Sequence, residues 1–158
     1  MIEYKFEQYN SLAPNLYRKE KYNLQVELLK LQEEIIKNKR RIAICFEGRD
    51  TAGKSSTINF FSEHLIPQNF NYVHLGIPTP HEKKFWFERW EKHLPKKGQL
   101  VLFDRSWYTR ALTEPTLGYC SKPQYEEFMN NVNKWEENLI NQGIEIVKFY
   151  FSIDKEQQ

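Results

Sequence analysis

The sequence is poor in cysteine: its 158 residues contain only Cys45 and Cys120, with neither a Cys-x-x-Cys pair nor a disulfide framework. This composition excludes a disulfide-stabilised secreted domain and favours a reducing cytoplasm. The chain also lacks an apolar run of about eighteen residues and an apolar leader, so we expect neither a membrane span nor secretion. Because 23 basic residues oppose 21 acidic ones, the overall charge gives no reason to expect a nucleic acid or a membrane surface as partner.

The chain contains enough hydrophobic and aromatic residues to form a folded core. Hydrophobic residues make up 40% of the chain and aromatic residues 15%, which indicates one domain covering residues 1–158. We expect residues 1–39 to form an N-terminal helical extension and residues 40–158 to form the core. The helical pattern runs from about residue 17 to residue 39. Its broad apolar face is expected to pack on a sheet or to pair with a second subunit, and it includes Leu24, Leu28, Leu31 and Ile35.

Residues 48–55 fit the phosphate-loop pattern of Gly, four residues, Gly, Lys and then Ser or Thr. A short apolar segment, residues 41–46, precedes this loop, and Ile58, Phe61 and Leu65 follow it at helical spacing. The order strand, loop, helix aims backbone N–H groups and a helix N-terminus at one spot, so we expect an anion to bind there. Lys54 is placed to reach the terminal phosphates of a nucleotide, and the Ser55 hydroxyl is placed to ligate magnesium.

A second acidic position follows an apolar segment, residues 99–104, which ends in Asp104. In a phosphate-loop enzyme a carboxylate at the end of such a strand lies beside the loop and holds magnesium, directly or through water. Asp50 lies inside the loop, where an acid would repel phosphate unless a cation stood between them. The sequence therefore predicts a metal site at Asp50, Asp104 and Ser55, for Mg²⁺ or, as the other candidate, Mn²⁺.

Strand patterns alternate with helix patterns along the rest of the core. Residues 72–75 and 145–153 are the other expected strands, and capping-box sequences open helices at Thr79 and Ser121. Asp154 is expected to cap a further helix, and because the chain stops in its first turn, the sequence is interpreted as C-terminally truncated. The alternation predicts an α/β fold with a parallel sheet and a ligand site at the carboxyl ends of the strands.

The helix that opens at Thr79 is expected to continue through His93 and to present an aromatic face. Arg89 is the one charged residue on that face, and it either extends to water or points at an anion in the cleft. Between His81 and Arg110, eight Lys and Arg residues oppose four Asp and Glu residues. This local excess of positive charge suits a strongly anionic substrate, although a solvated helix face explains it equally well.

Two strings carry a resemblance to a known family: EGRDTAGK at residues 47–54 and LFDRSWYTR at residues 102–110. Together with their spacing, they resemble the polyphosphate kinase 2 family, and the resemblance extends from about Leu24 to Gln158. It implies a three-layer P-loop kinase fold with a central parallel sheet and helices on both faces. It also implies magnesium-dependent phosphoryl transfer between inorganic polyphosphate and a nucleotide such as ADP, ATP, AMP or GDP, carried out by a homo-oligomer.

The resemblance also implies roles for individual residues. Asp50 and Asp104 correspond to acids that organise magnesium and the acceptor phosphate. Lys54, Arg105 and Arg110 correspond to basic residues that hold the phosphates in line, and such positioning of charge is what phosphoryl transfer requires. The other positions expected to contact the substrate are Gly48, Arg49, Thr51, Ala52, Gly53, Ser55, Ser56, Arg89 and Thr109.

Three departures from the family pattern affect these expectations. Ser55 and Ser56 stand where the family commonly has two glycines, and Thr109 replaces a common asparagine, which predicts an altered substrate preference. The family's basic lid is absent from this sequence, which predicts slower transfer because lids exclude water and complete the charge clamp. Two other functions remain open: an ATP-dependent nucleoside or nucleotide kinase, and a lid-less nucleotide-binding module with little turnover.

Overall fold

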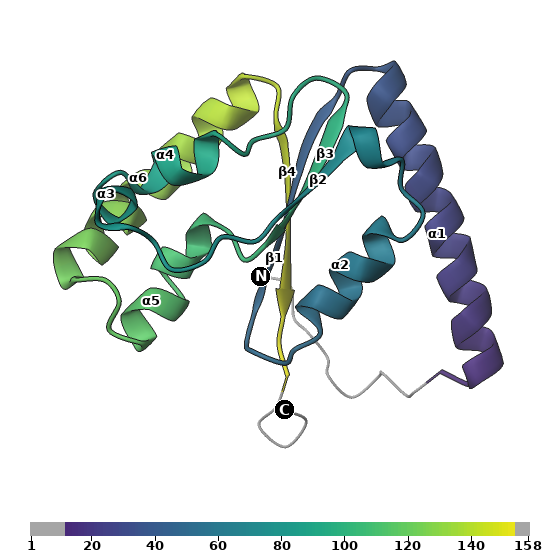
Figure 1. The fold of residues 1–158 in the computed structure, drawn as a ribbon, viewed down its shortest axis with the longest axis horizontal. Helices are drawn as coiled ribbons and strands as arrows, with labels where there is room; N and C mark the ends of the chain where they lie inside the picture. The colour runs from purple at the N-terminus through teal and green to yellow at the C-terminus, as the bar shows by residue number, and fades with distance from the viewer. Residues whose placement is uncertain (1–11, 154–158) are drawn as a thin grey trace.

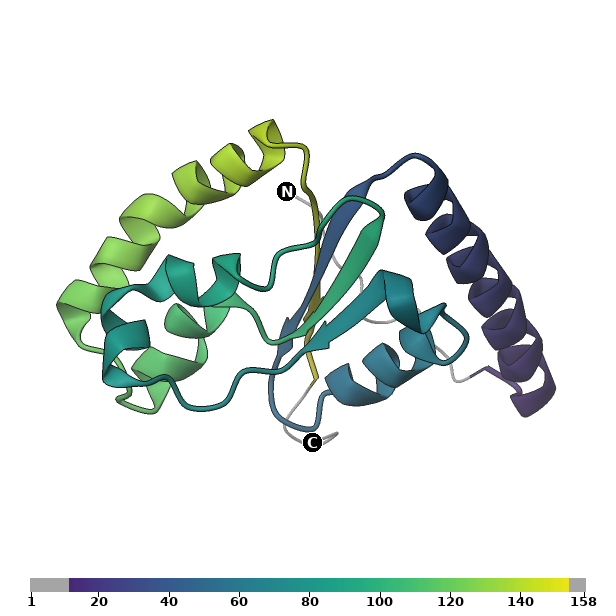
Figure 2. The same ribbon diagram turned by 45° about the horizontal axis from the view of Figure 1, so that its top comes forward.

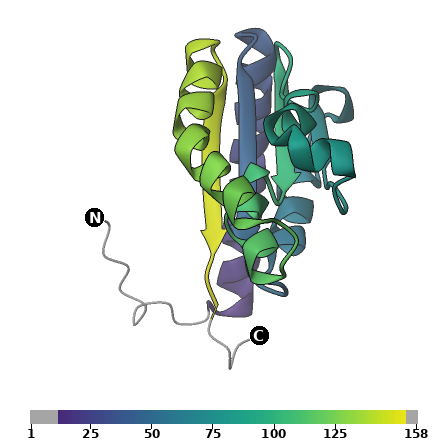
Figure 3. The same ribbon diagram turned by 90° about the vertical axis from the view of Figure 1, so that its left-hand side faces the viewer.

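The computed structural model describes residues 12–153, so the expectations for residues 1–11 and for a helix at Asp154 lie outside the described residues. The centre is a four-stranded parallel sheet with the order β2-β3-β1-β4. Figure 3 shows β4, β1 and β3 side by side in this order. The strands are β1 (Arg41–Gly48), β2 (Phe70–Val73), β3 (Gln99–Asp104) and β4 (Glu145–Phe151).

Helices cover both faces of this sheet. The α-helices are α1 (Pro14–Lys37), α2 (Lys54–Ser62), α3 (Pro80–Lys84), α4 (Trp86–Glu91), α5 (Thr113–Thr116) and α6 (Lys122–Asn141), and two 3-10 turns are η2 (Pro67–Asn69) and η3 (Trp107–Arg110). In Figures 1 and 2, α1 and α2 lie on one face, whereas α3 to α6 lie on the other. This arrangement confirms the predicted α/β fold with a parallel sheet and helices on both faces. Within the described residues, no helix is long and apolar enough to cross a membrane.

The two central strands are apolar along nearly their whole length, because a parallel sheet covered by helices buries both of its faces. Residues 42–46 of β1 and 100–103 of β3 are all buried. Strand β1 is longer than the predicted segment 41–46, since Glu47 and Gly48 continue its pairing with Tyr150 and Phe151. Strand β2 begins and ends two residues before the predicted segment 72–75, and β4 ends at Phe151 instead of residue 153.

Each face of the sheet has its own apolar core. On the face of α1 and α2, Ile35 and Ile58 pack with residues of β1 and β3. On the opposite face, Trp90 and Trp107 are 2% and 0% exposed and meet edge to face, with ring centroids 6.4 Å apart. Truncating a buried aromatic ring costs about 3–5 kcal/mol, so this second core is a main source of the stability of the fold.

Helix α1 packs through most of the predicted apolar stripe, since Ile35 is buried and Leu28 and Leu31 pack against the same core. Leu24 departs from the prediction because it is 56% exposed, whereas Gln25 and Gln32 are buried. The amide of Gln32 donates to the Ile66 carbonyl at 2.9 Å and accepts from the Ile66 N–H at 2.6 Å. The N-terminal part of α1 stands away from the sheet in Figure 1, so only its later turns have a core to pack on.

The helix predicted from Thr79 through His93 is interrupted. Its start is as expected, because Thr79 and Glu82 form a reciprocal capping box. Phe85 then leaves the helical conformation, with φ −112° and ψ 67°, and separates α3 from α4. The break reorients the chain so that Trp86 and Trp90 both enter the core.

A substitution at Gly48 tests how closely β1 and β4 approach at the end of the sheet. Gly48 has φ 137°, and an added Cβ would lie 2.3 Å from the Phe151 carbonyl oxygen. Gly118 also has positive φ, 70°, but its added Cβ would meet nothing within 4 Å. We expect Gly118→Ala to cost about 1 kcal/mol in unfolding free energy and Gly48→Ala at least about 2–3 kcal/mol more, because β4 must move. Equal losses in equilibrium urea unfolding would contradict this close approach.

Candidate active site

The phosphate loop joins β1 to α2 at the carboxyl edge of the sheet. The backbone turns through positive φ at Gly48, Thr51 and Gly53, with values of 137°, 62° and 91°. Gly53 is the residue that precedes α2, and no side chain caps the helix there. The first N–H groups of α2 therefore lack helical partners, and a helix start of this kind binds anions.

Lys54 lies within the curve of this loop and is 7% exposed. Its ammonium group donates to the carbonyl oxygens of Gly48 at 3.0 Å and Arg49 at 2.6 Å. Burial, with the positive charge of Arg105 as the next cause, lowers the pKa of Lys54. Because an ammonium has three hydrogens, one remains for a phosphate oxygen. The geometry suits the predicted role of Lys54.

Asp104 ends β3 beside the loop and collects polar partners. Its Oδ2 accepts from the Ser55 hydroxyl at 3.1 Å and from the Tyr72 hydroxyl at 2.9 Å, and His74 Nδ1 lies 3.6 Å away. Burial and this hydrogen bond raise the pKa of Tyr72 to about 12, so its hydroxyl stays protonated and donates. Tyr72 and His74 were not among the predicted site residues, although they lie at the end of β2 and the carboxyl ends of parallel strands meet at one edge of the sheet.

Ser55 and Asp104 together present oxygen ligands of the kind that Mg²⁺ prefers. Within residues 12–153, no group of three or more His, Cys, Asp or Glu side chains forms a metal site. This donor set fits a magnesium ion that is bound by one or two protein oxygens and otherwise by substrate phosphates and water. Asp50 lines the same hollow, but its carboxylate pairs with Arg105.

Arg105 follows Asp104 in a left-handed conformation, with φ 64°. Its N–H donates to the Phe46 carbonyl at 3.0 Å, and its guanidinium group donates to the Thr113 hydroxyl at 2.7 Å and pairs with Asp50. These contacts direct a cation toward the phosphate loop. The result is a hollow of about 300 Å³, here called the loop hollow, lined by Lys54, Ser55, Asp104 and Arg105 among others.

Glu47, which was not among the predicted site residues, holds this arrangement together. It is 6% exposed, and its Oε1 accepts from both the Ser106 N–H at 2.6 Å and the Ser106 hydroxyl at 2.7 Å. Burial raises the pKa of Glu47, while the hydrogen bonds from Ser106 oppose that rise. Because Ser106 directly follows Arg105, this contact fixes the turn that aims Arg105. The feature of the sequence that could have identified Glu47 is a carboxylate inside an otherwise apolar strand.

Arg89 does not line the loop hollow, and the expectation that it extends to water is wrong, whereas its contact with an anion stays a prediction. Arg89 is 4% exposed, so it does not extend to water, and its guanidinium group donates to the Gly76 carbonyl. The group lies 5.5 and 5.6 Å from the ring centroids of Trp86 and Trp90. Aromatic faces attract guanidinium groups, which explains why Arg89 remains in this cluster.

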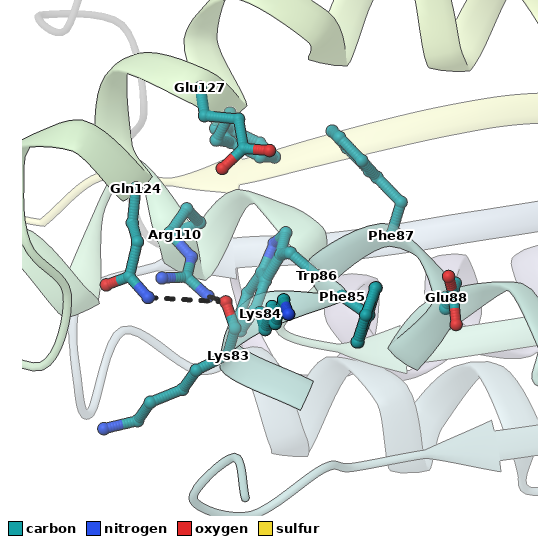
Figure 4. A pocket seen from close by; sticks show the side chains of 10 residues that line it. Lys83, Lys84, Phe85, Trp86, Phe87, Glu88, Arg110, Gln124 and Glu127 are labelled. Atoms are coloured by element: carbon teal, nitrogen blue, oxygen red, sulfur yellow. Dashed lines mark hydrogen bonds between the residues drawn. The ribbon is translucent and has the colours of Figure 1, made fainter. Parts of the chain in front are cut away.

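Arg110 and Thr109 also lie outside the loop hollow. Arg110 is 1% exposed, lies 4.0 Å from the ring centroid of Trp86 and pairs with Glu114 at 3.2 Å. It lines a separate hollow of about 200 Å³ between α3, α4 and α6, shown in Figure 4. The Thr109 hydroxyl donates to the carbonyl of Ser106, the residue that precedes η3. A role for either residue in phosphoryl transfer therefore stays a prediction.

Three features define the class of this protein as a P-loop kinase fold with a phosphate site. They are a glycine loop that leads into a helix, a buried lysine in that loop, and a carboxylate at the end of the neighbouring strand. The family is shown by sequence, since residues 11–158 match the model of polyphosphate kinase 2. The chain belongs to the polyphosphate kinase 2 family, as the resemblance predicted.

Individual relatives agree with this family. The GDP-polyphosphate phosphotransferase of Pseudomonas aeruginosa is 46% identical over 145 residues, which are 91% of this chain and 41% of the relative. The ADP-polyphosphate phosphotransferase of the same species is 40% identical over 148 residues, which are 93% of this chain and 49% of that relative. The chain thus spans about half the length of the curated relatives that it matches.

Two solved structures share the fold. A Pseudomonas aeruginosa chain assigned to polyphosphate kinase 2 superimposes with a TM-score of 0.86 at 31% identity, over 94% of this chain and 33% of that one. Polyphosphate kinase 2 from Arthrobacter aurescens superimposes with a TM-score of 0.84, over 98% of this chain and 59% of that one. The second pair is 24% identical, so it supports the fold alone.

The contact between Glu47 and Ser106 can be tested by stability. Glu47→Ala leaves two buried Ser106 donors without an acceptor, and each unsatisfied donor costs about 1–3 kcal/mol. We expect a total loss of about 2–4 kcal/mol in urea unfolding, whereas Glu47→Gln keeps an acceptor oxygen and is expected to lose clearly less at neutral pH. If Glu47→Ala unfolds at the wild-type urea concentration, Glu47 does not hold the turn.

The raised pKa of Glu47 also predicts a pH dependence. A carboxyl whose pKa is higher in the folded state stabilises the fold fully below its unfolded-state pKa, and this stabilisation is lost as the pH rises through the folded-state pKa. From about pH 4.5, the ordinary value, upward, the wild type is therefore expected to lose stability relative to Glu47→Gln. Urea unfolding of both proteins in steps from pH 4 to pH 8 measures the difference. Parallel curves would show that Glu47 titrates normally.

Proposed function

We propose that this chain provides the phosphate-loop part of an enzyme that transfers phosphoryl groups between inorganic polyphosphate and a nucleotide, such as ADP, GDP or AMP. The observation that carries the proposal is the convergence of Lys54, Ser55, Asp104 and Arg105 on the loop hollow. Membership of the polyphosphate kinase 2 family supports it. The names of the relatives, GDP- and ADP-polyphosphate phosphotransferases, support polyphosphate and nucleoside diphosphates as the substrates.

In the proposed reaction, a terminal phosphate oxygen of the nucleotide attacks the terminal phosphorus of polyphosphate. The new P–O bond forms as the bond to the rest of the polyphosphate breaks, and the shortened chain leaves with the electron pair. Such a transfer needs its reactants in line and positive charge near the transferred oxygens. Lys54 and the loop N–H groups hold those oxygens, and Arg105, directed by Asp50 and Thr113, supplies a second cation.

Magnesium dependence is part of the proposal. Ser55 and Asp104 would hold the ion, and Mn²⁺ is the other candidate. A bound divalent ion neutralises the phosphate charge that Asp50 and Asp104 would otherwise repel. Tyr72 orients the Asp104 carboxylate toward this task. The cytoplasm remains the proposed location.

Assembly into a homo-oligomer is also proposed. The exposed apolar residues along α1 support it, since a second copy is one surface able to cover them. They are Leu16, Tyr17, Tyr22 and Leu24.

Lys54→Ala tests the proposed function. A charge-assisted hydrogen bond is worth about 1.5–3 kcal/mol, so we expect the variant to bind tripolyphosphate with magnesium about 10- to 150-fold more weakly in calorimetric titrations. We also expect magnesium- and polyphosphate-dependent formation of ATP from ADP to fall at least about 100-fold. Lys30→Ala, which removes an exposed lysine from α1, is the matched control and should behave as wild type.

Two outcomes would overturn this proposal. Wild-type affinity for tripolyphosphate in Lys54→Ala would show that the loop is not the phosphate site. Nucleotide phosphorylation that requires ATP and ignores polyphosphate would favour an ATP-dependent kinase.

A further inference from the structure

A polar network joins α6 and β4 to the turn that follows β3. Glu136 on α6 is 8% exposed, and its Oε1 accepts from the indole N–H of Trp107 at 2.8 Å. Its Oε2 accepts from the ammonium group of Lys148 on β4 at 2.5 Å, and that ammonium group also donates to the Tyr108 hydroxyl at 2.9 Å. These four residues are here called the Glu136 network. It holds η3 at two successive residues, Trp107 directly and Tyr108 through Lys148.

The Glu136 network buries a carboxylate, which packing alone does not require. Burial opposes the charge of Lys148, but hydrogen bonding to Glu136 and Tyr108 raises the pKa of Lys148, so its ammonium group stays charged. The same group lies 4.8 Å from the ring centroid of Tyr108. What these contacts add to packing is direction, because a hydrogen bond restricts the angle between the groups that it joins.

Arg105 is the residue that needs a turn of fixed direction. Its φ of 64° is in the left-handed region, which is unfavourable for a residue with a side chain and persists only where the surrounding structure holds it. The next residue, Ser106, is held by Glu47 of β1. Trp107 is held by α6 through its indole and by α4 through its carbonyl, which accepts from the Trp86 indole N–H at 3.0 Å. The backbone after Arg105 therefore cannot relax without breaking contacts to three different elements.

We propose that Glu136 is a positioning residue for Arg105. Glu136 acts through Trp107 and Tyr108, which it holds in place within η3. The fixed η3 in turn maintains the left-handed turn that aims the guanidinium group of Arg105 at the loop hollow. This inference rests on the proposed function, because it takes Arg105 to be a cation that binds the transferred phosphate.

A double-mutant cycle of Glu136→Leu and Arg105→Ala tests the inference, with tripolyphosphate and magnesium titrated calorimetrically into the whole chain. Arg105→Ala alone is expected to weaken binding about 10- to 150-fold, as for the loss of a charge-assisted hydrogen bond. Glu136→Leu alone is expected to weaken binding about 5- to 30-fold, because the cation remains but is no longer held in place. In the Arg105→Ala background, Glu136→Leu is expected to change the affinity by less than about twofold, since no guanidinium group remains to be positioned.

Three further variants make this cycle specific. Glu136→Gln keeps an oxygen that accepts from the Trp107 indole, and should bind tripolyphosphate within about threefold of wild type. Trp107→Phe removes the indole N–H but leaves the pair of Glu136 with Lys148, and should reproduce both the loss and its dependence on Arg105. Glu137→Leu removes an exposed carboxylate one residue further along α6, and is the matched control for the lost charge. Circular dichroism and thermal melts establish that each variant is folded before it is titrated.

The outcomes separate this inference from the proposed function. Wild-type affinity in folded Glu136→Leu and Trp107→Phe overturns the inference, as does an equal loss with and without Arg105, which would show general support of the loop. If neither variant folds, the network serves the fold as a whole and the inference is overturned. A wild type that binds no tripolyphosphate overturns it together with the proposed function. A loss that depends on Arg105, in a chain that binds tripolyphosphate but transfers no phosphate to ADP, supports the role of Glu136 and overturns the proposed function.

Discussion

The site depends on the in-register pairing of β1 with β3. Phe46 is paired with Asp104, so the two strands reach the carboxyl edge together and the phosphate loop begins beside the metal-binding candidate. Arg105 then donates its N–H to the Phe46 carbonyl, and Glu47 receives two hydrogen bonds from Ser106. A one-residue shift in this register would turn Asp104 to the opposite face of the sheet and break all three contacts.

The sequence was most informative where function is encoded locally. The glycine spacing and Lys54 predicted a strand, loop and helix, and the structure contains β1, the loop and α2 in that order. Parallel strand ends explain why Asp104 could be placed beside the loop from its position after an apolar segment. Glu47 could not be assigned in this way, because its partner Ser106 is 59 residues away and the hydrogen bond exists only after β1 and β3 pair.

Helical periodicity did not predict the contacts of a side chain for which several partners compete. It placed Arg89 on an aromatic face, but it gave no information on whether the guanidinium group prefers an anion or the neighbouring rings. The guanidinium groups of Arg89 and Arg110 both lie over the ring of Trp86. The carboxylates of Glu82 and Glu114 balance the buried charges of these two arginines. The helix break at Phe85 escaped prediction for a related reason, since it serves tertiary packing of Trp86 and Trp90 instead of local preference.

The position of Lys54 has a consequence for the energetics of the resting protein. Its ammonium group donates to two main-chain oxygens of its own loop, which leaves the third hydrogen for an incoming anion. Arrival of an anion thus adds a partner without displacing one, and much of the desolvation of the buried charge has already been met during folding. The loop is spared a large rearrangement, because the lysine is held at the binding site before any anion is bound.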